Sequence, residues 1–220
     1  MYQWDFSILW NYRWLFLQGL WVTCAFTVAI VILGMAAGLV GALGKLSRFA
    51  VFRHTSLIFI EIFRCTPILV QLVWCYYALP ILIGVEMSAV TAGVLALSLY
   101  GGSFYAEIIR GGIVSIDPGQ TEAGAALGMT PAQTMRRIIL PQALKRMVPP
   151  LMNQSILQFK NTSLVSVLAV PDLLYQSQVA AHDSYRPLET YTFVAVAYFV
   201  ILFPLTLLVR WGETKLSASE

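Results

Sequence analysis

The sequence predicts an all-α integral membrane protein with five transmembrane helices. Of its 220 residues, 58% are hydrophobic and only 11% are charged, and the mean hydropathy is +0.73. An ordinary soluble domain carries about a quarter charged residues. The apolar residues also occur in long uncharged runs, which need a bilayer rather than a water-soluble core. We therefore expect one transmembrane domain that occupies residues 1–220.

Five apolar runs are long enough to cross a bilayer, because a helix rises about 1.5 Å per residue and the hydrocarbon core is about 30 Å thick. The predicted spans are residues 14–43, 56–83, 88–109, 148–170 and 189–210. The first run is longer than a signal-peptide core, and residues 1–5 before it carry no positive charge, so we expect it to be retained. Residues 110–147 are too polar to cross and form a loop.

The basic residues predict the orientation. If the loop after the first span faces the cytoplasm, ten Lys and Arg residues lie on that side and two lie outside. The ten are Lys45, Arg48, Arg53, Arg110, Arg136, Arg137, Lys145, Arg146, Arg210 and Lys215, and the two are Arg13 and Arg186. The amino terminus is then outside and the carboxyl terminus inside. Because these charges report topology, the net charge of +3 does not indicate a nucleic-acid partner.

Small residues and prolines predict local features of the first two spans. Gly34, Gly38 and Ala42 recur every four residues and form a smooth strip where a second helix can approach closely. We expect that helix to belong to the same chain, with a subunit interface as the alternative. Pro67 and Pro80 lack a backbone donor, and we expect them to bend the second span.

Residues 117–141 of the polar loop predict two short helices. Asp117-Pro118 is a helix start, and Gly128 is a good carboxyl cap. The run from Thr130 to Gln133 has the pattern of a capping box, and we expect Pro141 to end the second helix. Two interpretations fit these two helices: a docking surface for a partner protein, or an amphipathic hairpin on lipid that uses Arg136, Arg137, Ile138 and Ile139.

The same loop resembles the EAA loop of ABC importer permeases, whose pattern is E-A-A-x3-G-x9-I-x-L-P. The matching residues are Glu122, Ala123, Gly124, Gly128, Ile138, Leu140 and Pro141. Only Gly124 departs from the pattern, and it is another small residue. The resemblance implies that these residues couple the chain to a cytoplasmic ABC ATPase subunit, with the loop helix inserted into a cleft of that subunit.

The resemblance covers nearly the whole chain and extends to the branch that takes up histidine, arginine, glutamine and glutamate. It rests on residues 61–67, 105–112 and 160–164. It implies a type I ABC importer permease fold in a bacterial cytoplasmic (inner) membrane and transport by alternating access. ATP would be bound and hydrolysed by separate subunits, so no cofactor is expected in this chain. The implied partners are an identical or homologous second permease subunit and an extracytoplasmic amino-acid-binding protein, besides membrane lipid.

Polar residues inside the predicted spans are candidates for a substrate pathway, because such groups are costly in lipid unless they are paired or wetted. They are Glu61, Arg64, Gln154, Gln158, Lys160, Asn161, Thr162 and Ser163. Two alternatives stay open: an intrahelical pair between Glu61 and Arg64, and interhelical hydrogen bonds made by the polar face of the fourth span. Gln154, Gln158 and Asn161 share that face, because they follow helical spacing. Lys160 would lie near a substrate carboxylate or pair with Glu61.

The sequence does not predict an enzyme. It has no GxSxG elbow, no HExxH and no phosphate-binding GxxxxGK[ST] loop. His54 and His182 lack companion ligands, so no metal site is predicted. Residues 171–187 form a predicted outer loop, either a docking site for the binding protein or a solvated connection. The exact solute, an amino acid of any charge or an opine-like compound, stays open, and a passive channel is the competing function.

Overall fold

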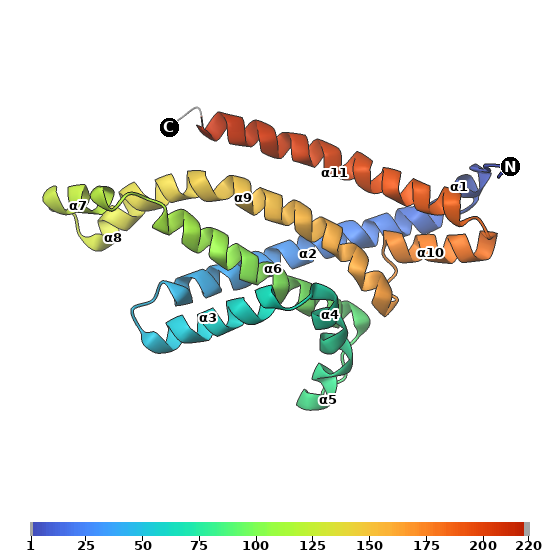
Figure 1. Cartoon of the computed structure of the whole chain (residues 1–220), viewed down its shortest axis with the longest axis horizontal. Coiled ribbons are helices and arrows are strands. Elements are labelled where there is room, and N and C mark those ends of the chain that lie inside the picture. The colour runs from blue at the N-terminus through green and yellow to red at the C-terminus, as the bar shows by residue number, and fades with distance from the viewer. Residues whose placement is uncertain (1, 218–220) are drawn as a thin grey trace.

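The computed structural model describes residues 2–217, and the elements there are helices (Figure 1). They are α1 Ser7–Asn11, α2 Arg13–Lys45, α3 Ala50–Cys65, α4 Ile68–Tyr77, α5 Leu79–Ile83, α6 Ala89–Val114, α7 Pro118–Ala126, α8 Pro131–Thr134, the π-helix η1 Met135–Ile139, α9 Leu140–Asn161, the 3-10 helix η2 Thr162–Leu168, α10 Leu173–Ser184 and α11 Pro187–Ser217. The all-α prediction is confirmed for this part of the chain.

Among the described residues, three helices are long and apolar enough to cross a membrane by themselves: α2, α6 and α11. The number rises to five if each of two bent helix pairs counts as one span. The first pair is α3 with α4, and the second joins residues 131–168 to α10. The structure thus supports three clear spans and allows the five that the sequence predicts.

The predicted second span is not one straight helix. Helix α3 ends at Cys65, α4 begins at Ile68, and the two axes differ by 107°. Pro67 lies at this break, where its missing N–H and fixed φ interrupt the helix. Pro80 lies in the first turn of α5, a position that suits proline. Figure 1 shows α4 and α5 turned away from the line of α3.

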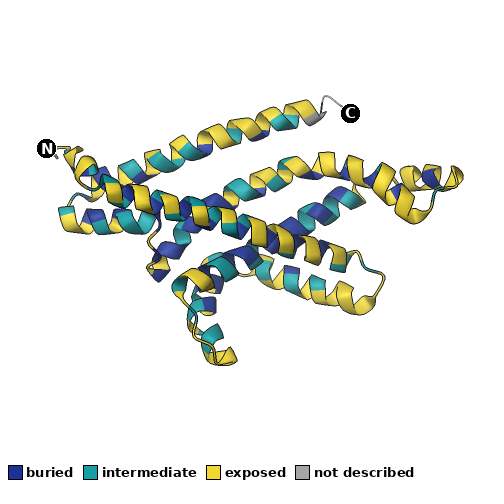
Figure 2. Cartoon of the chain, turned by 180° about the vertical axis from the view of Figure 1, so that it is seen from behind, coloured by how far each residue is buried: buried dark blue, intermediate teal, exposed yellow. Residues whose placement is uncertain are grey.

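Helices α2 and α6 form the most extensive helix pair. Gly34 and Gly38 of α2 lie directly against the backbone of α6, close to Gly102 and Tyr105. Ala42 is fully buried further along the same face. The prediction that the strip of small residues packs on a helix of the same chain is confirmed. Burial is concentrated along this contact, whereas α11 is largely exposed (Figure 2).

Residues 171–187 do not form an open loop, although the sequence predicts one. Asp172 accepts a hydrogen bond from the Tyr175 amide and starts α10. The helix buries Leu173, Ser177, Ala180 and Ala181, which recur at helical spacing. Tyr185, with φ of +53°, ends the helix in the left-handed region. The segment is therefore a helix packed against α2 and α11.

The two ends of the molecule carry different elements (Figure 1). The amino terminus, α1 and α10 lie at one end, and α7, α8 and the α2–α3 connection lie at the other, with the end of α11. At the first end, the buried carboxylate of Glu189 accepts hydrogen bonds from the Tyr2 hydroxyl at 2.5 Å and the Asp5 amide at 3.0 Å. Arg186 also donates to the Gln3 carbonyl at 2.8 Å. These bonds attach the amino-terminal segment to the start of α11.

Candidate functional site

The projection, residues 117–141, is a capped helix folded back on the start of the next one. The Asp117 side chain accepts a hydrogen bond from the Gly119 amide, and Pro118 occupies the first helical turn of α7. Thr130 and Gln133 form the predicted capping box at the start of α8. Both helix starts are thus stabilised by side chains within a few residues, and these two predictions are confirmed.

Gly128 closes α7 with a complete Schellman motif. Its φ is +73°, a conformation that glycine adopts without steric cost. The Gly128 amide donates to the Ala125 carbonyl at 2.9 Å, and the Met129 amide donates to the Gly124 carbonyl at 3.0 Å. Since these bonds satisfy the last carbonyls of α7, the helix ends sharply at the residue that the sequence pattern indicates.

Gly124 lies on the inner face of the projection, and its small size is required there. It is buried, and a Cβ atom at this position would stand 2.6 Å from Thr134 Oγ1 and 2.7 Å from Thr134 Cγ2. Glu122 and Ala123 are exposed on the outer face of the same helix. The motif thus separates into one residue that packs α7 onto α8 and two that remain accessible to a partner.

The second helix of the projection does not end at Pro141, and that prediction is wrong. Residues 135–139 form a π-helix, and Pro141 lies in the first turn of α9, which runs on to Asn161. Proline cannot donate to the carbonyl four residues back. A π turn of this kind is a recognised way for a helix to absorb such an interruption. Ile138 is half-buried, whereas Leu140 and Pro141 are exposed.

Contacts tie the projection to the helices beneath it. Gln142 Nε2 donates to Gln120 Oε1 at 3.3 Å and to the Ile138 carbonyl at 3.0 Å. Arg146 donates to the Ser115 carbonyl at 2.6 Å, at the end of α6. The apolar cluster below contains Ala42, Ile60, Ala106, Ile109, Ile116, Ile139, Ala143 and Met147. These contacts join the projection to α6 and α9.

Two of the polar pathway candidates face one cavity. Gln154 and Lys160 line an open cavity of about 520 Å³ between α9 and α11, together with Asn153, Thr206 and Glu213 among its polar residues. Glu213 accepts a hydrogen bond from Asn153 at 3.0 Å. Gln154 is buried, and its Nε2 has no hydrogen-bond partner among the described residues. We refer to this space as the α9/α11 cavity.

The other candidates on this helix are bound to backbone or to each other. Gln158 is fully buried and donates to the Leu97 carbonyl of α6 at 2.8 Å, beside Gly101. Asn161 donates to Gln158 Oε1 at 3.1 Å. Thr162 and Ser163 donate to carbonyls three residues earlier, those of Phe159 and Lys160. For Gln158, this geometry favours the interhelical hydrogen bond over contact with a solute.

Glu61 and Arg64 lie apart from the α9/α11 cavity, near the end of α3. Both are exposed, and no ion pair joins them in the part of the chain that the structure describes. Arg64 instead lies over the Phe104 ring of α6, with its Cζ 5.6 Å from the centroid. The Cys65 thiol donates to Glu61 Oε2 at 3.5 Å. The structure therefore does not bring the two candidate groups into one cavity.

Sequence reasoning missed several polar contacts between helices. Glu107 pairs with Lys45 at 2.5 Å and with Arg110 at 3.0 Å, which joins the ends of α2 and α6. Glu213 enters the α9/α11 cavity although it lies 60 positions after Asn153. Only the Glu107–Arg110 spacing was visible in the sequence, because the other partners are brought together by the fold.

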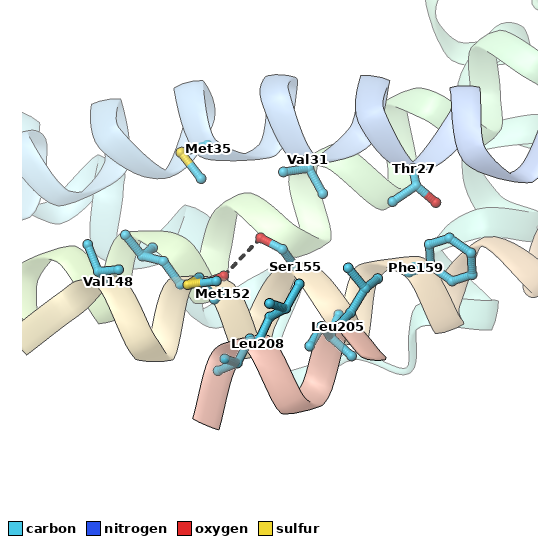
Figure 3. Close-up of a pocket in the computed structure, with 12 residues that line it drawn as sticks. Thr27, Val31, Met35, Val148, Met152, Ser155, Phe159, Leu205 and Leu208 are labelled. Atoms are coloured by element: carbon cyan, nitrogen blue, oxygen red, sulfur yellow. Dashed lines mark hydrogen bonds between the residues drawn. The ribbon is translucent and has the colours of Figure 1, made fainter. Parts of the chain in front are cut away.

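An apolar groove of about 500 Å³ lies between α2, α9 and α11 (Figure 3). Its polar side chains, Thr27 and Ser155, are already satisfied: Thr27 donates to the Thr23 carbonyl, and Ser155 to the Leu151 carbonyl. Ser155 Oγ also lies 2.9 Å from Tyr105 Oη. Since the described side chains that line it offer no free donor, this groove is not suited to a polar solute.

Comparison with known proteins places these features in a family. Residues 30–218 match the family described as binding-protein-dependent transport system inner membrane component. The chain is 39% identical to the glutamine transport system permease protein GlnP of Escherichia coli K12, over 97% of this chain and 98% of the relative. It is 34% identical to the arginine transport system permease protein ArtQ of Bacillus subtilis, over 93% of each.

Solved structures give the same result. A crystal structure of an amino acid ABC transporter with histidines matches with a TM-score of 0.91 and 38% identity, over 97% of this chain and 100% of the other. The inward-facing MetNI methionine ABC transporter matches with a TM-score of 0.70 at 24% identity, over 92% of this chain and 98% of the other, and supports the type I permease fold alone. The chain therefore belongs to the inner membrane components of binding-protein-dependent transport systems, and it is the membrane-spanning permease subunit of an ABC importer.

Proposed function

We propose that the chain carries a polar amino acid, in the manner of its glutamine and arginine relatives, across a bacterial cytoplasmic membrane by alternating access. The observation that carries this proposal is the capped helix α7, which projects from the bundle with Glu122 and Ala123 exposed. A rigid short helix transmits a rigid-body movement without itself deforming. The energy would come from ATP hydrolysed on separate ATPase subunits, and the chain itself needs no cofactor.

The distribution of basic residues supports an inward orientation of the projection. Arg136 and Arg137 belong to it, and Lys45, Arg110 and Arg146 belong to the same end of the bundle. Positive residues collect on the cytoplasmic side of membrane proteins. In this orientation the amino terminus and α10 are outside, where a solute-binding protein would dock. The seven motif residues then form the coupling element, in which Glu122 and Ala123 face the ATPase and Gly124 packs α7 onto α8.

For the pathway, we propose that the α9/α11 cavity takes the solute. Lys160 supplies a cation for the α-carboxylate, Gln154 forms part of the wall, and Glu213 lies beside Asn153 toward the other end. Asn153 and Lys160 are seven positions apart, which corresponds to about 10 Å along the helix. This spacing suits a solute that carries a carboxylate at one end and a polar group at the other, as glutamine and arginine do. A second permease subunit, identical or homologous, would complete the path.

The function is tested by reconstituting the assembled transporter, with its ATPase subunits and binding protein, in liposomes. We expect ATP-dependent uptake of labelled glutamine, arginine or histidine that stops when the ATPase is disabled by mutation. Uptake that continues without ATP hydrolysis would identify a channel. If the transporter imports an opine-like solute but no polar amino acid, the substrate class is opine-like compounds instead.

The pathway is tested by Lys160→Met. Removing the cation should raise the KM for uptake by about tenfold, since a hydrogen bond to a charged group contributes about 1.5–3 kcal/mol. Lys145→Met, on the same helix but outside the cavity, is the matched control and should leave KM unchanged. Gln158→Leu should instead lower the yield of folded protein, because it removes a buried interhelical bond. Equal KM values for Lys160→Met and the parent would exclude this cavity.

A further inference from the structure

The break between α3 and α4 leaves backbone carbonyls without their usual partners. In a continuous helix the Phe63 carbonyl would accept from the amide of residue 67. Residue 67 is proline, which has no N–H. The 107° change of direction also takes the Thr66 carbonyl out of the helical pattern. Inside a bilayer no water is available to satisfy these groups, so the protein must do so.

Gln71, in the first turn of α4, supplies the missing donor. Its Nε2 lies 2.9 Å from the Phe63 carbonyl oxygen and 3.2 Å from the Thr66 carbonyl oxygen, and it also contacts Thr66 Oγ1. The Thr66 hydroxyl itself donates to the Ile62 carbonyl at 2.6 Å, so its oxygen is an acceptor toward Gln71. Because all three neighbours are acceptors, the amide nitrogen must face them.

This interaction is built into the interior. Gln71 is only 8% exposed and lies in α4 beside the buried Leu72, which belongs to the apolar cluster formed with α6. The amide therefore reaches from a buried position in α4 to the end of α3, where Thr66 is exposed. A part-buried hydrogen bond of this kind is costly to remove where the carbonyl left behind stays unsatisfied.

We propose that Gln71 is a positioning residue for transport, which fixes the turn between α3 and α4 by donating to carbonyls on the other side of the break. The last two turns of α3 carry Glu61 and Arg64, with Arg64 over Phe104 of α6. The direction of these side chains depends on how α3 ends. The inference rests on the proposed transport function, and it assigns to Gln71 the role of holding the bend rather than contacting the solute.

The first test is Gln71→Met, which keeps the length of the side chain and removes its donors. We expect the variant to assemble with its ATPase subunits, to exchange amide hydrogens faster over residues 62–72, and to transport about tenfold more slowly. Gln18→Met is the matched control, because Gln18 is exposed on α2. It should match the parent in all three measurements. Unchanged exchange and unchanged transport in Gln71→Met would overturn the proposal.

The second test is the double variant Pro67→Ala with Gln71→Met. Alanine restores an N–H that can satisfy the Phe63 carbonyl but does not hold the turn. We expect protection from exchange to return while transport stays low. Recovery of both would show that Gln71 merely satisfies a carbonyl, and would overturn the positioning role. If the Gln71→Met protein does not accumulate, the transport rate of the double variant decides. A low rate supports the positioning role, and a parental rate overturns it.

The exchange measurement also separates this inference from the transport proposal. A parent complex that imports no amino acid would refute the transport function. Gln71→Met with unchanged exchange over residues 62–72 would refute the role of Gln71 at the bend, whatever the solute.

Discussion

Replacing Gly38 with alanine should strongly destabilise the folded subunit. The new Cβ would stand 2.5 Å from Tyr105 Cβ and 3.0 Å from both the Ala106 amide nitrogen and the Gly102 carbonyl oxygen. Two of these three atoms are backbone, and Tyr105 is fully buried, so the contact cannot be relieved by a side-chain rotation. Helices α2 and α6 would have to separate.

We expect a cost of about 3 kcal/mol, at the upper end for overpacking, which corresponds to a fall in the melting temperature of the detergent-solubilised subunit of about 10 °C. Gly111→Ala is the control, since Gly111 lies in the partner helix α6 and no described atom of another part of the chain stands within 4 Å of the place that its methyl group would occupy. That variant should melt like the parent. Equal melting temperatures for both variants would mean that α2 and α6 do not pack this closely.

Gly128→Val should uncouple transport from ATP hydrolysis. Gly128 has φ of +73°, and a β-branched residue in this conformation costs about 1–2 kcal/mol or more. Among the described residues nothing lies within 4 Å of the new Cβ, so the effect comes from the backbone alone. The Schellman motif would open, and α7 would lose its fixed direction over α8. We expect weaker co-purification with the ATPase subunits and a transport rate lower by about tenfold or more.

Gly128→Asn provides the comparison, because asparagine tolerates the left-handed conformation and is the usual alternative at this cap. It should retain most of the association and transport. A valine variant that binds the ATPase and transports normally would show that the projection is not the coupling element. Failure of both variants would instead indicate that the exposed surface at Gly128, and not its φ, is what the partner requires.

Local signals made the projection predictable. Asp117, Gly128, Thr130 and Gln133 each act on groups within a few residues, so their pattern in the sequence was sufficient to locate both helix starts and the turn. The close packing of Gly34 and Gly38 was also predictable, since small residues spaced by four form a strip whatever lies opposite. The identity of the partner helix, α6, was not.

Prolines were harder to interpret because one residue type has several outcomes. Pro67 breaks a span, Pro80 and Pro141 lie in first turns, and Pro149 lies within α9. Which outcome applies depends on whether another group donates to the carbonyl that the proline leaves without a partner. The Gln71 side chain does so for the Phe63 carbonyl. Helix α10 was missed because its buried face consists mostly of small residues, which give a weak apolar signal.

The polar pathway was the least predictable part. Helical spacing placed Gln154, Gln158 and Asn161 on one side of α9, but it could not distinguish a side chain that binds the next helix from one that faces a cavity. Gln158 proved to be the first kind and Gln154 the second. Glu213 comes from a helix far along the chain, so no local pattern reveals it.

The uninterrupted path from α8 through η1 into α9 has a mechanical consequence. Helix α9 has 22 residues, or about 33 Å of length, and no break divides it between Leu140 and Asn161. It can act as a lever arm that tilts from the end that carries the projection. A tilt of only about 5° at one end would sweep Lys160 through about 3 Å at the other, given that length.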